Sequence, residues 1–218
     1  MYKTHFIILA SAIGYRMKTY EPRCMNKYRK DTIINHLVKK INKNTNCFVT
    51  IVSGIKHGKI KKYIKNSKLD NIREVFNEKY EDDSMRNTMR LGAEGIKSES
   101  ICFLHSDIYF EHELDMNFLE SFFTTNPNLK EKEIGIDFND GFAGGFSYTS
   151  QQKWGKIANL YGQDRDNLLK LLDTNLRSLD VELYNKIIDI NKTIKVHKTE
   201  GHFLEIDTIK ELKNDSDS

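Results

Sequence analysis

A loop of small residues followed by two arginines is the part of the sequence best suited to chemistry. The run from His5 to Leu9 has the composition of a buried strand, and residues 10–14, Ala-Ser-Ala-Ile-Gly, follow it. Small side chains after a strand let backbone N–H groups approach a phosphate closely. Arg16 and Arg23 come soon after and can neutralise such a phosphate. The spacing indicates a nucleoside triphosphate site, and an ordinary first strand and turn is the alternative.

Two aspartates, Asp107 and Asp207, each follow an apolar, strand-like segment. Ligands of parallel sheets bind beyond the carboxyl ends of the strands, so we expect both carboxylates to converge on the loop after the first strand. Carboxylate oxygens are preferred ligands of Mg²⁺, and Glu205, two residues before Asp207, could assist them. A helix cap or a turn is the alternative role for either aspartate.

Length and composition exclude several classes of protein. The 218 residues are 39% hydrophobic, which is enough for a sizeable core. A net charge of +3 gives no case for a nucleic-acid partner. No apolar stretch approaches the ~20 residues of a membrane span, and we see no cleavable leader. Cys24, Cys47 and Cys102 form no CxxC pair, which favours buried thiols and a cytoplasmic location.

Strand-like and helix-like segments alternate in the first half of the chain. The periodicity predicts strands over residues 6–9, 47–53, 72–76 and 100–104, and helices over 32–43, 59–64 and 84–96. This alternation predicts an α/β fold, a three-layer α/β/α sandwich around a mostly parallel mixed sheet. We expect the first, second and last of these strands to be adjacent in that sheet.

The second half is less regular but continues the same domain. We expect strands over residues 134–138, 144–148, 193–197 and 202–208, and helices over 156–160, 167–179, 181–190 and 209–213. With no repeat and no linker, residues 1–213 are predicted to form a single domain. Residues 214–218 are predicted to be a polar tail.

Three segments resemble motifs of the sugar-phosphate nucleotidyltransferases. Residues 9–17 with Pro22-Arg23 resemble their Leu-Ala-Ala-Gly-x-Gly-x-Arg-Met…Pro-Lys signature. Residues 104–110, Leu-His-Ser-Asp-Ile-Tyr-Phe, look like the segment that supplies their first metal-binding aspartate. Residues 203–208 with Glu211 and Leu212 resemble their closing Glu-Ile-Asp-Thr…Asp-Leu motif. The segments occur in the family's order, and the resemblance implies the nucleotide-diphospho-sugar transferase fold.

Further segments resemble the phosphocholine cytidylyltransferase branch of that family. Residues 75–80, Val-Phe-Asn-Glu-Lys-Tyr, and Thr88 are similar to its Asn-x-x-Tyr segment and the helix that follows. Gly144 falls in a small-residue turn that in this family lines the acceptor side. The resemblance therefore implies CTP as the favoured triphosphate and a small phosphorylated or phosphonate acceptor.

The resemblance also implies a reaction and a set of site residues. The reaction is a Mg²⁺-dependent transfer of a nucleoside monophosphate, with release of pyrophosphate. Catalysis is assigned to Arg16, Arg23 and Asp107, and the metal to Asp107 and Asp207. Acceptor contacts are assigned to Tyr109, Gly144 and Glu205. The implied nucleotide-binding residues are Leu9, Ala10, Ser11, Ala12, Gly14, Tyr15, Arg16, Arg23, Thr88 and Asp107.

Two departures from the family pattern keep alternatives open. Ala12 replaces the first glycine of the loop, and Arg23 replaces a lysine, so a catalytically weak nucleotide-binding protein is one alternative. A glycosyltransferase of the related nucleotide-sugar fold is another, with Ser106-Asp107 as the remnant of its metal motif. The two arginines argue against it, because a nucleotide-sugar donor has no pyrophosphate to expel. A homodimer is also left open.

Overall fold

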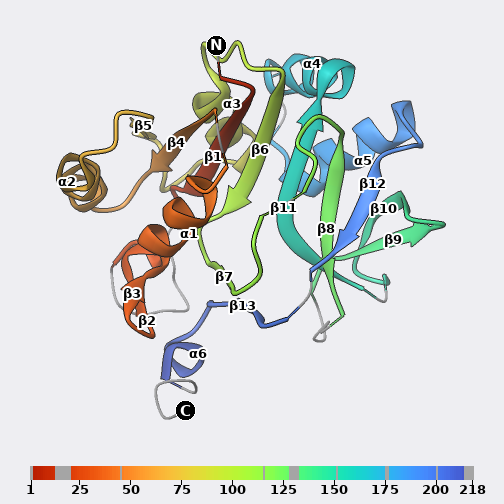
Figure 1. The fold of residues 1–218 in the computed structure, drawn as a ribbon. Helices are drawn as coiled ribbons and strands as arrows, with labels where there is room; N and C mark the ends of the chain where they lie inside the picture. Colours follow the sequence, from red (N-terminus) through yellow and green to blue (C-terminus); the bar gives the residue numbers. More distant parts are fainter. Residues whose placement is uncertain are drawn as a thin grey trace.

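A nine-stranded mixed sheet forms the centre of the molecule (Figure 1). The structure, a computed structural model, describes residues 2–12, 21–44, 46–114, 116–127, 133–150, 152–174, 177–199 and 201–213. Within these residues the strand order is β5-β4-β1-β6-β11-β8-β12-β10-β9. The strands are β1 (Thr4–Ala10), β4 (Cys47–Ser53), β5 (Ile72–Phe76), β6 (Ser100–His105), β8 (Phe122–Asn126), β9 (Gly135–Asn139), β10 (Phe142–Ser147), β11 (Lys153–Tyr161) and β12 (Lys195–Lys198).

The first four strands of this order are parallel, as their sequences predict. Strand β1 is buried at all seven positions and pairs with β4 on one side and β6 on the other. Its side chains alternate between two apolar clusters, with Phe6 and Ile8 in one and Ile7 and Leu9 in the other. Burial on both faces explains the continuous apolar run. The predicted adjacency of the three strands is confirmed.

The other half of the sheet is mixed. Strand β11 is antiparallel to both β6 and β8, whereas β12 is parallel to β8. Strand β10 is antiparallel to β12 and to β9 at the edge. The prediction of a mixed α/β fold around a largely parallel sheet is therefore confirmed.

Helices pack against both faces of the sheet. Residues of α1 (Ile33–Ile41) and α2 (His57–Ser67) belong to the apolar cluster on one face. Residues of α3 (Met85–Ala93), α4 (Gly162–Leu172) and α5 (Asp180–Ile190) belong to the cluster on the other. Helix α1 buries apolar side chains at helical spacing, and the Thr32 hydroxyl accepts a hydrogen bond from the Asn35 backbone N–H at 3.3 Å, which caps its start.

A two-stranded ribbon replaces helices over part of the α1 side. Strands β7 (Ile108–Phe110) and β13 (Phe203–Glu205) pair with each other, and their residues join the cluster that contains Phe122 of β8 and Ile157 of β11. The smaller elements near them are η2 (Arg23–Met25), β2 (Lys27–Tyr28), β3 (Asp31–Thr32) and α6 (Ile209–Lys213). The full three-layer sandwich is accordingly not confirmed, because helices do not cover all of this face.

Two predicted helices differ from the observed elements. Residues 156–160 were predicted to be helical, but they lie within strand β11. This strand is buried on both faces and so lacks the alternation that distinguishes a strand from a buried helix. The helix predicted over 167–179 begins at Gly162 and ends at Leu172. The first turn of α4 is polar, so the pattern of apolar residues did not show where the helix begins.

The three cysteines are buried free thiols, as expected. Burial raises the pKa of the Cys24 thiol to about 12. None of the helices in the described part of the chain has the length and apolar character needed to span a bilayer. Residues 214–218, predicted as a tail, lie outside the described residues.

Candidate functional site

A buried polar network lies at the carboxyl end of β1. The Ser11 hydroxyl is 2.8 Å from the Thr88 hydroxyl of α3. The Asn77 side-chain amide, just after β5, donates to Thr88 at 3.4 Å and to Asp83 at 2.5 Å. Gly54, just after β4, lies so close to the Ser11 carbonyl that a Cβ there would be 2.3 Å from its oxygen. Three strand ends and the first half of α3 thus meet at the start of the predicted nucleotide loop.

The loop itself is described only in part. Leu9 and Ala10 are buried on opposite faces of β1, and Ala12 is exposed. Gly14, Tyr15 and Arg16 lie outside the described residues, and their nucleotide roles stay predictions.

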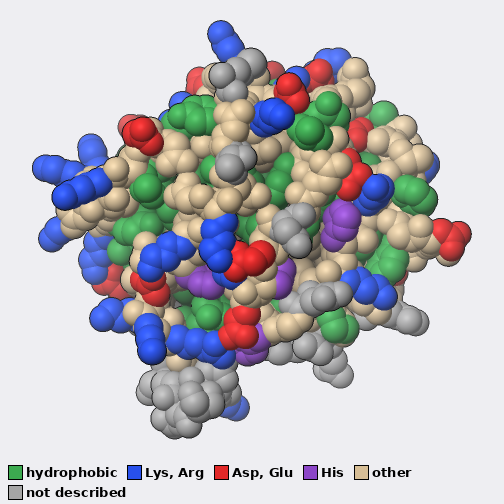
Figure 2. Space-filling view, viewed as in Figure 1, with side chains coloured by type: hydrophobic (Ala, Val, Ile, Leu, Met, Phe, Trp, Pro, Cys, Tyr) green, Lys and Arg blue, Asp and Glu red, His purple; other side chains and the backbone are tan. Residues whose placement is uncertain are grey.

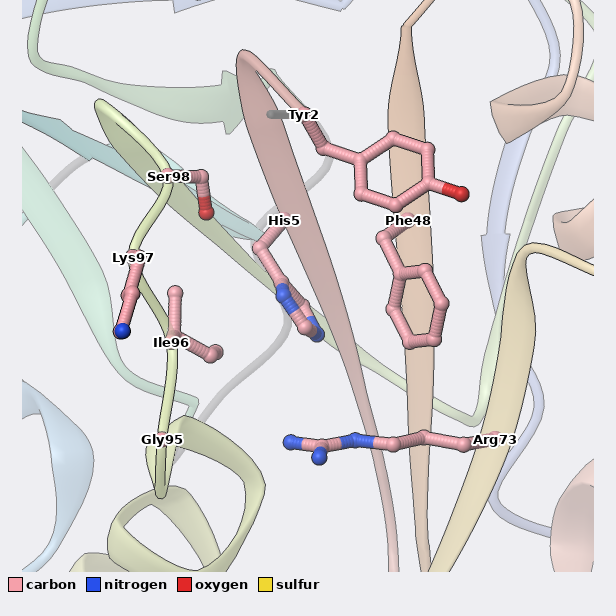
Figure 3. A pocket seen from close by; sticks show the side chains of 8 residues that line it. All are labelled: Tyr2, His5, Phe48, Arg73, Gly95, Ile96, Lys97 and Ser98. Carbon is pink, nitrogen blue, oxygen red and sulfur yellow. The ribbon is translucent and has the colours of Figure 1, made fainter.

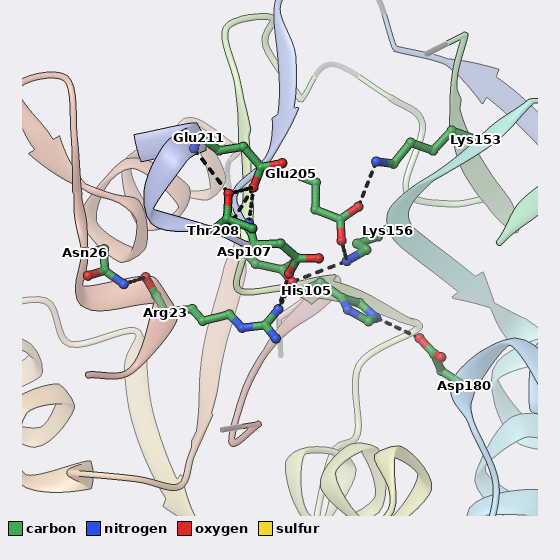
Figure 4. A network of polar contacts seen from close by, with 11 residues as sticks. Arg23, Asn26, His105, Asp107, Lys153, Lys156, Asp180, Glu205, Thr208 and Glu211 are labelled. Carbon is green, nitrogen blue, oxygen red and sulfur yellow. Dashed lines mark hydrogen bonds and ion pairs between the residues drawn. The ribbon is translucent and has the colours of Figure 1, made fainter. Parts of the chain in front are cut away.

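Three carboxylates meet beside the β7–β13 ribbon (Figure 4). Asp107, Glu205 and Asp207 each offer an oxygen, and these oxygens lie within 4.8 Å of one another. Backbone pairing creates the cluster, because Glu205 pairs with Ile108 across the ribbon. The Ile206 N–H also donates to the Asp107 carbonyl at 2.7 Å. Two segments about a hundred residues apart in the sequence are thereby brought together, as expected for the two aspartates.

Cationic side chains face this acidic cluster. The Arg23 guanidinium donates through Nη1 to Asp107 Oδ2 at 2.8 Å and to Asp207 Oδ1 at 2.5 Å. The Lys156 ammonium lies 3.3 Å from Asp107 Oδ2 and also donates to Glu205. Acidic and basic side chains appear side by side on this face of the molecule, and further lysines gather over α2 at its left edge (Figure 2). The predicted Arg23 therefore lies at the predicted carboxylates.

Two lysines of β11 were missed in the sequence analysis. Lys153 Nζ lies 2.9 Å from Glu205 Oε2, so it shares this carboxylate with Lys156. Residues three apart in a regular strand point to opposite faces. Here the register shifts between Trp154 and Ala158, and Lys156 adopts a left-handed φ of 57°. Such a bulge re-aims side chains, which places both lysines at one carboxylate. The only signal in the sequence was a pair of charges at the start of an apolar run.

The charges of the cluster shift its pKa values in opposite directions. Burial opposes ionisation of Asp107, but Lys156, the His105 ring and Arg23 more than offset it and hold the pKa of Asp107 well below its usual range. Burial together with the neighbouring carboxylates Glu205 and Asp107 raises the pKa of Asp207, despite Arg23. Of the three carboxyl groups, Asp207 is therefore the one whose ionised form is disfavoured by its surroundings.

The donor set of the cluster fits a hard divalent cation. All three groups are carboxylates, the type of ligand that Mg²⁺ prefers. Asp107 is only 5% exposed, and its Oδ1 atom has no hydrogen-bond partner among the described residues. A buried carboxylate oxygen without a partner is costly, and a cation would satisfy it. Burial and the neighbouring carboxylates raise the pKa of Asp207, and a cation bound here would offset the repulsion between the carboxylates.

His105 lies near the acidic cluster and is held by residues outside it. Its Nε2 lies 2.7 Å from Asp180 Oδ2 at the start of α5, and its ring meets Trp154 edge-on at 5.0 Å. These contacts orient the ring.

Solved structures of similar fold include nucleotidyltransferases. The CTP:phosphocholine cytidylyltransferase of Streptococcus pneumoniae superimposes with a TM-score of 0.81 at 16% identity, over 99% of this chain and 98% of that one. The chain has the nucleotidyltransferase fold. The inositol-1-phosphate CTP transferase of T. maritima gives a TM-score of 0.76 at 12% identity, over 98% of this chain and 92% of its own.

A putative glucose-1-phosphate thymidylyltransferase of Bacillus anthracis gives a TM-score of 0.83 at 11% identity, over 98% and 94% of the two chains. No protein-family model and no curated protein matches the sequence. The likeness spans nearly the whole chain, so the resemblance inferred from short motifs holds for the nucleotidyltransferase fold.

The residues predicted on the acceptor side of this nucleotidyltransferase fold are spread out. Glu205 belongs to the acidic cluster. Tyr109 packs against Tyr28 and His36, with ring centroids 4.6 and 4.2 Å apart. Gly144 lies on β10, separated from β11 by β8 and β12 in the sheet order. The structure therefore groups Glu205 with the carboxylates, and the acceptor roles of all three residues stay predictions.

Proposed function

We propose that the chain transfers a nucleoside monophosphate, with CTP as its favoured donor, to a small phosphorylated or phosphonate acceptor and releases pyrophosphate. The observation that carries this proposal is the cluster of carboxylates and cations at the carboxyl ends of β1 and β6. Asp107 and Asp207 lie there with Arg23 between them, and Lys156 on the other side of Asp107. This is the edge of the sheet where α/β proteins bind their ligands.

The reaction needs charge neutralisation more than proton transfer. An oxygen of the acceptor phosphate forms a bond to the α-phosphorus of the triphosphate, and the bond from this phosphorus to the bridging oxygen breaks as pyrophosphate leaves. The attacking oxygen is already ionised near neutral pH, so no general base is required. Two anions must approach each other, and charge builds up on the oxygens of the α-phosphate.

Among the described residues, we assign Arg23 and Lys156 to neutralise the negative charge of the phosphates. Burial opposes the charge of Lys156, but Asp107 and Glu205 outweigh it and raise the pKa of Lys156, so this ammonium stays charged throughout the neutral range. Arginine is charged at every relevant pH and presents several donors to phosphate oxygens. The incoming phosphates compete with the carboxylates for these two cations. Arg16 remains a proposed third cation.

We assign Asp107 and Asp207 to Mg²⁺, with Glu205 beside them. When bound, the ion would offset the repulsion between the two phosphates and polarise the α-phosphate. Asp107 Oδ1, the buried oxygen without a partner among the described residues, is the atom of this chain best placed to hold it. Glu205 holds Lys156 and Lys153 in place through its two oxygens.

Two observations favour CTP and a small acceptor. Hydrogen bonds join Thr88 to Ser11 and to Asn77, and this supports the proposed role of the segment that resembles the cytidylyltransferases. Two of the solved structures of similar fold are a CTP:phosphocholine cytidylyltransferase and an inositol-1-phosphate CTP transferase. Sugar-phosphate enzymes of other triphosphates share the fold equally well, so the choice of CTP rests on the residues of this network.

Pyrophosphate release tests the proposal. The purified chain is mixed with Mg²⁺, one of CTP, UTP, dTTP, ATP or GTP, and one of phosphocholine, inositol 1-phosphate or glucose 1-phosphate. We expect pyrophosphate with CTP and at least one acceptor, and a loss of ~10² or more in rate for Lys156→Met. The control is Lys61→Met, which removes an exposed lysine of α2. Release of nucleoside diphosphate from a nucleotide sugar would instead show a glycosyltransferase, and no product from any pair would refute catalysis.

A further inference from the structure

A cavity lies at the amino-terminal ends of the first strands of the sheet, away from the acidic cluster. Its volume is about 270 Å³, and it opens between the amino-terminal ends of β1, β4 and β5 and the loop that follows α3 (Figure 3). His5, Phe48 and Arg73 are each the second residue of their strand. The proposed nucleotidyl transfer takes place beyond the other ends of these strands, so it makes no use of this cavity.

One wall of the cavity is aromatic. The rings of Tyr2 and His5 both pack against Phe48, with centroids 5.2 and 5.1 Å apart. Burial, with a smaller contribution from Arg73, lowers the pKa of His5 to about 4, so its imidazole is neutral at physiological pH. A neutral ring that donates or accepts a hydrogen bond with Thr50 at 2.6 Å is a fixed, uncharged surface. Such a wall suits a planar apolar group.

The remaining groups of the cavity select for an anion. The lining residues include two cations, Arg73 and Lys97, and no acidic side chain. Arg73 is held in place through Nε, which donates to Thr50 at 3.0 Å, and through Nη2, which donates to the Glu94 carbonyl at 3.0 Å. Figure 3 shows its guanidinium crossing below His5 toward Gly95. The Nη1 atom, which has no partner among the described residues, is left for a ligand.

A buried hydroxyl completes the cavity. Ser98 is 5% exposed, and its Oγ has no hydrogen-bond partner among the described residues. In Figure 3 its side chain extends from the 95–98 loop on the side of His5. A buried hydroxyl without a partner costs free energy that a bound acceptor atom would recover. An arginine held by two hydrogen bonds and an unsatisfied hydroxyl, both facing aromatic rings, make a preformed site.

We propose that this cavity binds a small anion that carries a planar ring, with the ring against Phe48 and His5 and the anionic group at Arg73, Lys97 and Ser98. The volume admits one ring and one phosphate or carboxylate group. The site stands independently of the proposed transferase activity, because none of its residues belongs to the acidic cluster.

Phenyl phosphate is the probe, with inorganic phosphate and benzyl alcohol as its separate halves. The binding is followed by NMR through the ring signals of His5, assigned with His5→Gln, and those of His105, which lies at the acidic cluster. We expect phenyl phosphate to shift the His5 signals with a Kd below about 1 mM, and each half to bind at least about tenfold more weakly. Shifts confined to His105, or equal binding of inorganic phosphate alone, would overturn the proposal.

Variants locate the two parts of the ligand. Arg73→Gln and Lys97→Gln should each weaken phenyl phosphate binding about tenfold or more, and Phe48→Leu should weaken it without affecting inorganic phosphate. Lys97 is exposed and makes no hydrogen bond or ion pair with the residues that the structure describes, so its variant should melt as the wild type does even if Arg73→Gln is destabilised. The matched control is Lys61→Gln on α2. Unchanged affinity in Lys97→Gln and Phe48→Leu would refute the site.

Discussion

Replacing Lys156 by methionine tests the charge balance of the candidate site through stability alone. The Lys156 side chain is 17% exposed and lies between Asp107 and Glu205, whose side chains are 7% and 10% exposed. Removal of one partner from a buried ion pair costs ~3–5 kcal/mol, because it leaves a buried charge without compensation. Arg23 still pairs with Asp107 and Lys153 with Glu205, so we expect the lower end, about 3 kcal/mol, or a fall in Tm of ~6–12 °C.

The pH dependence of this loss follows from the carboxylates. The pKa values of Asp107 and Glu205 are lowered in the folded chain from ordinary values of 3.8 and 4.5, since the cations outweigh burial. Their ionised forms therefore contribute stability above pH ~5 that is lost as the pH falls through the folded pKa values. Without Lys156 both pKa values rise, and the carboxyls take up protons earlier. The cost of the substitution should thus shrink between pH 7 and pH 4.

Urea unfolding at a series of pH values measures this difference in the free energy of unfolding. The control is Lys39→Met, which removes a lysine that is 67% exposed and paired with Asp31, and should cost less than about 1 kcal/mol at every pH. A cost for Lys156→Met below that of the control at pH 7, or a cost that stays constant down to pH 4, would refute the argument.

Four further substitutions test the site and the strand beside it, with a fifth as a control. Asp107→Asn should lower the free energy of unfolding by about 2–3 kcal/mol. Burial and the neighbouring carboxylates raise the pKa of Asp207, so Asp207→Asn should leave the free energy of unfolding unchanged or higher. Both substitutions should abolish Mg²⁺-dependent transfer. Thr88→Val should cost about 1–2 kcal/mol in urea unfolding and raise the KM for CTP, because it breaks the contact with the nucleotide loop. Gly155→Ala places a Cβ 2.5 Å from a threonine hydroxyl and should cost about 1–3 kcal/mol, whereas Gly58→Ala, with open space, should not destabilise.

Each of these predictions has a contrary outcome. Equal stability losses for the two aspartate variants would contradict the opposite shifts of their pKa values. An unchanged KM for CTP in Thr88→Val would show that the network of Ser11, Thr88 and Asn77 does not contribute to nucleotide binding. Wild-type stability in Gly155→Ala would mean that the bulge of β11 tolerates a side chain.

The sequence predicted a helix or strand correctly where the pattern of apolar residues within that element shows which of its sides is buried. The apolar run of residues 6–9 predicts a buried strand, which is β1, and the spacing of Ile33, Leu37 and Ile41 predicts the buried face of α1. These patterns depend on the period of one element and on which of its sides meets water. Residues 156–160 of β11 were misread as a helix, because a short buried run without alternation fits a buried helix as well as a buried strand.

The residue types of the candidate site, and their order along the chain, were determined by the sequence alone. Asp107 and Asp207 were identified from their positions after strands, and Arg23 from its place after the loop. Tertiary structure decided which charges meet. Lys156 reaches the carboxylates only because β11 bulges, and Glu205 reaches them only because β13 pairs with β7. Pairing between distant strands and the register at which they pair depend on the whole sheet, so no local pattern encodes which cation faces which carboxylate.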